Sequence, residues 1–228
     1  MTEFLAAIAC FLLAHMIPPV PPVRRFFIGL LGQRTYMVAY SLLSLALIAW
    51  VIVAALRAPY VPLWPAERWQ ALVPLIAMPF ALWFMLGGLV EPNPLSISLY
   101  SGARNEAGPM ARVTRHPVLW GFLIWALSHI APNGNLVALI LFGGMAALAA
   151  GGFGLVDRRA RRRLGEARWQ AESRASPLLP FAAATALTAV DIGRLLLWAA
   201  AAVGIYLWFL LQGHSWLIGT DPLARFGS

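Results

Sequence analysis

Apolar residues form long runs along the chain, separated by short connections that hold most of the prolines and charges. A membrane-spanning helix needs about 20 predominantly apolar residues. Runs of this kind predict six spans, over residues 2–17, 35–56, 69–90, 117–130, 136–156 and 191–211. The pattern therefore predicts an all-α, polytopic membrane helix bundle of about six transmembrane helices, forming a single domain over residues 1–228.

Prolines interrupt or end several of these runs. Four of them lie within residues 18–22, where they remove backbone donors and enforce extended backbone, so the first span is expected to end there. Residues 26–31 are then expected to lie along the membrane interface. Pro74 and Pro79 fall inside the third span, and buried neighbours are expected to satisfy the carbonyls that they free. The apolar segment 178–190 is too short to span and is expected to be re-entrant or interfacial.

The fifth run is rich in glycine and alanine. Small residues let membrane helices approach one another closely. We therefore expect close helix contact at five glycines of this run, namely Gly143, Gly144, Gly151, Gly152 and Gly154.

Composition supports a membrane protein. The mean hydropathy is +0.74 and only 11% of the residues are charged, whereas soluble globular domains carry about 25%. The single cysteine, Cys10, excludes an internal disulfide. The net charge of +8 does not indicate a nucleic-acid partner, because the aromatic residues lie inside the apolar runs rather than among the arginines.

Arginine is distributed unevenly between the two sets of connections. The connections after the first, third and fifth spans hold thirteen arginines: 24, 25, 34, 104, 112, 115, 158, 159, 161, 162, 163, 168 and 174. The opposite side holds three, at 57, 68 and 225. The positive-inside rule places both termini outside the cytoplasm. The segment 157–174 is predicted to be a basic membrane-surface segment, with a lid over a cytoplasmic-side pocket as the alternative.

Four histidines occur in or beside the apolar runs: His15, His116, His129 and His214. Ionisable side chains at membrane depth mark cofactors or pathways, and imidazole is a usual ligand of haem iron. His116 and His129 are separated by roughly 20 Å along one helix, so they cannot bind the same iron. Two imidazoles from different helices would suit a haem, because the spans lack the carboxylates that a zinc or di-iron site uses.

Several segments resemble the NnrU family of membrane proteins. They are Thr-Arg-His-Pro-Val-Leu-Trp-Gly at 114–121, Trp-Ala-Leu-Ser-His at 125–129, Asn-Gly-Asn at 133–135, Ala14-His15, Arg24-Arg25, 31–36, 157–159, 164–166 and 180–183. The resemblance implies a multi-pass protein of the bacterial inner membrane, associated with denitrification. It also implies a relation to zeta-carotene isomerase, a haem b enzyme of polyene cis–trans isomerisation, whose axial histidines match His15 and His129.

Two lines of reasoning give different ligand pairs. The resemblance pairs His15 with His129 as metal ligands. Depth in the membrane, at 1.5 Å of rise per residue, instead pairs His15 with His116 and His129 with His214. Arg115 and His116 stand at the start of the fourth span, where they are expected to bind an anionic group of the cofactor.

A second, more distant resemblance leaves the reaction open. Gly108-Pro109, residues 115–117, Gly121, residues 164–166 and Trp169 are similar to the C-terminal pattern of isoprenylcysteine carboxyl methyltransferases, which implies S-adenosylmethionine as an alternative cofactor. A non-catalytic accessory membrane protein is the third interpretation. The expected partners are the lipid bilayer and an apolar or lipid-like small molecule.

The arginine asymmetry generates a topology prediction. With both termini outside the cytoplasm, an alkaline phosphatase fused after Ser228 should be active, and a fluorescent protein fused there should be dark. The reverse result would contradict the six-span topology.

Overall fold

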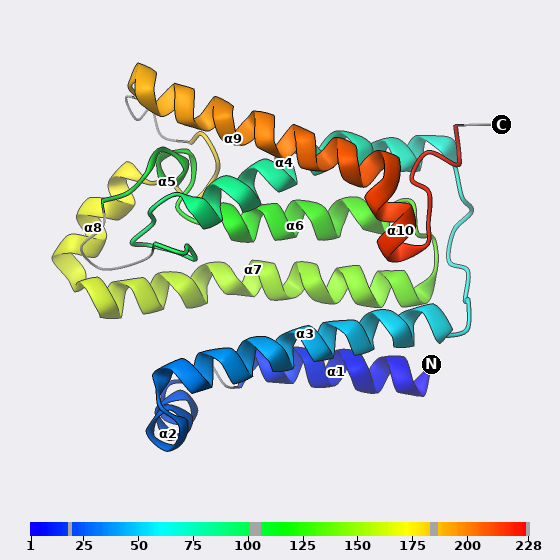
Figure 1. The fold of residues 1–228 in the computed structure, drawn as a ribbon, viewed down its shortest axis with the longest axis horizontal. Coiled ribbons are helices and arrows are strands. Elements are labelled where there is room, and N and C mark those ends of the chain that lie inside the picture. The colour runs from blue at the N-terminus through cyan, green and yellow to red at the C-terminus, as the bar shows by residue number, and fades with distance from the viewer. Residues whose placement is uncertain (18–19, 101–105, 183–186, 227–228) are drawn as a thin grey trace. The chain divides into compact units, whose positions relative to one another are not determined.

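The computed structural model describes residues 1–17, 20–100, 106–182 and 187–226, and its regular structure is helical (Figure 1). The elements are α1 (Thr2–Met16), α2 (Pro21–Leu31), α3 (Gln33–Arg57), α4 (Arg68–Val90), α5 (Pro109–Val113), α6 (Pro117–Ile130), α7 (Leu136–Leu164), α8 (Glu166–Ala175), α9 (Ala189–Trp208), the π-helical turn η1 (Phe209–Gly213) and α10 (His214–Ile218). Strands are absent from the described ranges, where one isolated bridge joins Pro62 and Asn135. The all-α prediction is confirmed.

Within the described ranges, the apolar helices α1, α3, α4, α6, α7 and α9 correspond to the six predicted spans. In this part of the chain, four helical stretches are long and apolar enough to cross a membrane: α3, α4, α7, and α9 continued through η1 and α10 to Ile218. The other two, α1 and α6, have 15 and 14 residues and are shorter than a straight span requires. The chain is therefore a multi-pass helical membrane protein.

Several boundaries differ from the expected ones. The helix that contains the fifth predicted span continues beyond residue 156, because α7 extends to Leu164 and includes the first part of the basic segment. Gly165, with φ at +81°, then separates α7 from α8. Residues 18–19 of the predicted proline break, and residues 183–186 of the predicted re-entrant segment, lie outside the described residues. The expected interfacial stretch 26–31 belongs to α2.

The chain divides into two compact units, and the first contains residues 1–64 and 134–141. In it α1 packs against α3. The backbone N–H of Leu63 donates to the carbonyl of Gly134 at 2.8 Å, and that of Leu136 donates to Val61 at 2.9 Å. These bonds tie the segment after α3 to the start of α7. The side of α1 that faces the core buries four side chains, Phe4, Ala7, Ile8 and Phe11.

The second unit contains residues 65–133 and 142–228, and α4 lies at its centre. Figure 1 shows α4 beside α6 and α9. The α4–α6 contact depends on two glycines. A Cβ atom at Gly121 would lie 2.6 Å from the carbonyl oxygen of Ala81, and one at Gly88 would lie 2.7 Å from the Pro117 side chain. These distances are shorter than van der Waals contact, so any side chain there would force the helices apart.

The expected contact role of the α7 glycines is mostly wrong. A Cβ atom at Gly143, Gly151 or Gly154 would meet no atom within 4 Å, whereas one at Gly152 would meet Leu119 at 3.0 Å. A run of small residues shows that close approach is allowed, but it does not show which face of the helix another element covers.

Tyr206 of α9 satisfies a carbonyl that a proline of α4 leaves free. Pro79 has no N–H to donate to the carbonyl of Leu75, four residues earlier in the helix. The Tyr206 hydroxyl donates to this carbonyl oxygen at 2.9 Å. The expectation that a neighbouring helix compensates for a proline is therefore confirmed at Pro79.

This pairing predicts a specific double-mutant result. Tyr206→Phe should lower the free energy of unfolding by about 1 kcal/mol, because the Leu75 carbonyl loses its donor. In a Pro79→Ala background, which restores the backbone N–H, the same change should cost almost nothing. Thermal unfolding in detergent measures both, and equal losses in the two backgrounds would contradict the pairing.

Candidate functional site

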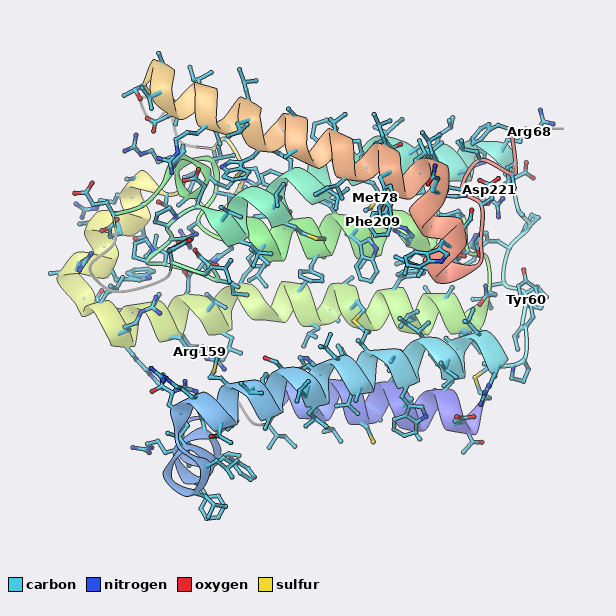
Figure 2. The ribbon with its side chains drawn as sticks, in the orientation of Figure 1. Tyr60, Arg68, Met78, Arg159, Phe209 and Asp221 are labelled. Atoms are coloured by element: carbon cyan, nitrogen blue, oxygen red, sulfur yellow. The ribbon has the colours of Figure 1, made fainter. Side chains whose placement is uncertain are left out.

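The second unit contains a partly open, mostly apolar cavity of about 470 Å³. Its wall comes from α4, α6, the first part of α7 that belongs to this unit, the α9–α10 region and the C-terminal segment. Figure 2 labels three of its lining residues, Met78 on α4, Phe209 on η1 and Asp221 on the C-terminal segment. The volume lies within the range of about 300–1,000 Å³ that is usual for small-molecule sites. We call it the His129 cavity.

His129 lies in the last turn of α6 and lines this cavity. Its Nδ1 is 2.8 Å from the carbonyl oxygen of Trp125, so Nδ1 carries the proton and donates it. Rings of Trp125 and Phe142 pack near the imidazole, at 5.8 and 5.2 Å between centroids. In the neutral ring the Nε2 lone pair is then available, which is the arrangement that metal-ligating histidines commonly adopt.

His214 lines the same cavity, directly after the π-helical turn. The backbone N–H of His214 donates to the carbonyl of Phe209, five residues earlier, which defines the π turn. The His214 Nδ1 donates to the carbonyl of Thr220 at 2.7 Å. The structure thus brings His129 and His214, which the depth reasoning placed at one level, to a single cavity.

The C-terminal segment closes part of the cavity through an arginine. Arg225 donates from Nη2 to the carbonyl of Pro132 at 2.7 Å, and from Nη1 to the carbonyl of Glu67 at 3.4 Å. These bonds join the chain end to the end of α6 and the start of α4. Sequence reasoning did not identify Arg225, Asp221 or Tyr206 as cavity residues, because no local motif marks them.

His15 belongs to the first unit and has the same local arrangement as His129. Its Nδ1 donates to the carbonyl of Phe11 at 2.7 Å. The centroids of the His15 and Phe11 rings are 4.1 Å apart. In both cases the imidazole donates to the carbonyl four residues earlier and packs beside an aromatic ring at that position. The Nε2 of His15 lies 3.3 Å from the Ser44 hydroxyl.

His116 differs from the other histidines because one of its nitrogens faces a carboxylate. It is fully buried, its Nε2 is 3.0 Å from the Asp157 carboxylate, and its Nδ1 is 2.8 Å from the Ser96 hydroxyl. Since a carboxylate can only accept, Nε2 donates, and in the neutral ring Nδ1 accepts from Ser96. Arg115 donates to the other carboxylate oxygen at 2.8 Å. We call Ser96, Arg115, His116 and Asp157 the His116 cluster.

Further hydrogen bonds attach two loops to this cluster. The buried Asn93 side chain donates to the carbonyl of Arg115 at 3.0 Å and accepts from the backbone of Leu95 and Ser96. Thr114 donates to the carbonyl of Leu178 at 2.8 Å. Arg115 and His116, expected to contact a cofactor, therefore form part of a hydrogen-bonded network that joins α6 and α7 to the loops around residues 93–96 and 178.

A buried carboxylate, that of Glu91, fastens α9 to the end of α4. Glu91 is 2% exposed, and its Oε1 accepts from Trp198 at 2.7 Å and from Arg194 at 3.1 Å. Gly108 lies so close that a Cβ atom there would be 2.5 Å from Glu91 Oε2. The glycine of the Gly108-Pro109 pattern thus has a packing role against this carboxylate.

The comparisons with known proteins agree on one family. The family model described as NnrU protein matches residues 3–222. The 15-cis-zeta-carotene isomerase, chloroplastic, of Zea mays is 30% identical over 159 residues, which cover 68% of this chain and 43% of that protein. The chain thus spans less than half the length of this curated relative. No solved structure matches.

The His116 cluster predicts a large effect of a small substitution. Asp157→Asn should lower the free energy of unfolding by about 2–4 kcal/mol, because it removes the charge that faces Arg115 in a partly buried site. Glu172→Gln is the matched control, since Glu172 pairs with Arg168 at 3.7 Å on the exposed α8, and such pairs contribute little. Thermal unfolding in detergent compares the two, and equal effects would refute the structural role of the cluster.

Proposed function

The chain belongs to the NnrU family, and from this membership together with the His129 cavity we propose that it is a haem b protein that isomerises an apolar polyene. The observation that supports this most directly is the position of His129 in a mostly apolar cavity, with its Nδ1 held by the Trp125 carbonyl and its Nε2 left for a ligand. We place the chain in a bacterial inner membrane as part of this proposal, and the arginine distribution supports an orientation with both termini outside the cytoplasm.

The residues present fit a haem. His129 would hold the haem iron through Nε2, because its hydrogen bond to the Trp125 carbonyl at 2.8 Å fixes the tautomer. His15, which has the same local arrangement, is the second ligand that the family relationship favours, and His214 is the alternative within the cavity. When bound, the iron would supply one-electron chemistry next to the substrate's double bonds.

The cavity wall suits an extended apolar substrate. Trp125, Phe142 and Phe209 present aromatic surface, which packs well against a flat conjugated chain. The Tyr206 hydroxyl is already used by the Leu75 carbonyl, so this residue presents its ring to the cavity without an unsatisfied polar group. These side chains exclude water and limit rotation of the substrate to the bonds that the cavity leaves room for.

Absorption spectra of purified variants test the cofactor. Wild-type protein should show a haem b Soret band, and His15→Ala and His129→Ala should each abolish it, because each removes an axial ligand. His214→Ala should retain the band and serves as the control.

Other results would change the ligand assignment. If His214→Ala abolishes the band while His15→Ala does not, the two iron ligands are His129 and His214. If His116→Ala abolishes it and His129→Ala does not, the family pairing is wrong, and absence of haem under all expression conditions would defeat the cofactor proposal.

An isomerisation assay tests the activity separately. Protein in liposomes that contain 15-cis-zeta-carotene should convert it to another geometric isomer, as measured by chromatography, and His129→Ala should not. A haem-loaded protein without this activity would refute the isomerase function and favour an accessory role in nitrogen-oxide reduction. Activity that requires S-adenosylmethionine would favour the methyltransferase-like alternative.

A further inference from the structure

A second, smaller cavity lies at the charged end of α7. Its volume is about 160 Å³, and its lining comes from the loop after α4 and from one face of α7: Leu95, Ser96, Ile97, Val156, Arg159 and Arg163 are among the lining residues. Arg159 and Arg163 are four positions apart, so they share a face of the helix. Figure 2 labels Arg159 on this part of α7. We call it the Arg159 cavity.

The wall of the Arg159 cavity has an apolar part and a basic part. Leu95, Ile97 and Val156 supply the apolar part, and the two arginines supply the basic part. The cavity lies where the apolar run of α7 gives way to charge, immediately after Val156. In a membrane helix this change in composition marks the level of the lipid headgroups.

Arg163 is oriented by the protein itself. Its guanidinium donates through Nη2 to the carbonyl of Pro94, in the loop that forms the opposite wall. A guanidinium has five donors, so this bond fixes the group and leaves further N–H groups for a ligand. Within the described residues, no carboxylate forms an ion pair with Arg163.

The nearest acidic side chains already have basic partners. Asp157 binds Arg115 and His116, and Glu166 binds Arg161. The pKa of the Glu166 carboxyl is lowered by the hydrogen bond from Arg161, so it stays ionised and keeps that arginine. Among the described residues, the lining of the Arg159 cavity contains two arginines and no carboxylate.

We propose that the Arg159 cavity binds the phosphate group of an anionic phospholipid. Arg159 and Arg163 would donate to the phosphate oxygens, a pairing that the planar guanidinium makes well. Leu95, Ile97 and Val156 would contact the glycerol and the first part of the acyl chains. One water requires only about 10–15 Å³ of such space, so the cavity admits a much larger group. Free phosphate shares the charge but gains nothing from the apolar wall.

Two double variants of equal charge test the site. Purified protein in neutral detergent is titrated with phosphatidylglycerol, and bound lipid is counted by native mass spectrometry. Arg159→Gln with Arg163→Gln should weaken binding about tenfold or more, given the contribution of each arginine near a phosphate. Arg158→Gln with Arg162→Gln removes the same charge from residues turned about 100° around the helix. These side chains do not line the cavity, and their exposed charges are screened at physiological ionic strength, so this change should weaken binding by less than about twofold.

The other outcomes each overturn the proposal. Equal weakening in the two double variants would indicate general surface charge. Full competition by millimolar inorganic phosphate would indicate a soluble anion site, and equal binding of phosphatidylcholine would indicate an apolar site alone.

A further double variant covers the case in which the glutamine variant does not fold. Arg159→Lys with Arg163→Lys retains the charge but loses the planar guanidinium, and it should weaken binding by about threefold. Unchanged binding in that variant would contradict guanidinium recognition. The site does not involve His129, so failure of the haem proposal leaves it unaffected.

Discussion

The Asp157 carboxylate is the group on which the arrangement of the second unit depends most. It accepts hydrogen bonds from His116 and Arg115 and so joins α7 to the start of α6. Apolar contacts between membrane helices hardly favour one register over another, because lipid tails are as apolar as leucine. A partly buried carboxylate with two specific donors selects one register, since any shift along the helix axis would leave charges without partners.

The register set at one end of α6 has effects at the other end. His116 and His129 lie at opposite ends of this short helix, roughly 20 Å apart. Gly121 between them keeps α6 in contact with the backbone of α4, so the helix has little freedom to slide or rotate. The polar end of the unit therefore determines where the His129 imidazole enters the apolar cavity, even though the two sites share no atoms.

Hydrogen-bond partners explain why histidines of one chain differ in what they can bind. His116 has a carboxylate on one nitrogen and a hydroxyl on the other, so neither is available to a ligand. His15 and His129 each donate to the carbonyl four residues earlier through Nδ1, and among the described residues neither faces a carboxylate; the Nε2 of His15 lies 3.3 Å from the Ser44 hydroxyl. The sequence places all four histidines in or beside apolar runs, but it does not show which of them face a carboxylate on another helix.

Local patterns predicted the helices well, because apolar run length and proline position act within one segment. They did not predict the contacts that build the sites. The Tyr206 bond to Leu75 and the Arg225 bond to Pro132 join segments far apart in the chain, and no periodicity records such pairs. The α7 glycines failed as contact residues because composition does not identify the covered face, and α7 extended past residue 156 because arginine is itself a good helix former.

The π-helical turn at Phe209–Gly213 separates two requirements that a regular helix would couple. Before it, α9 presents Trp198 to Glu91 and Tyr206 to Leu75; after it, His214 lines the cavity. Each residue of an α-helix advances the direction of the side chains by about 100°. Loss of Leu211, Gln212 or Gly213 would therefore redirect His214 away from the cavity, although none of these three residues is among its lining residues. The number of residues in this turn therefore determines the direction of the His214 side chain, independently of which residues form the turn.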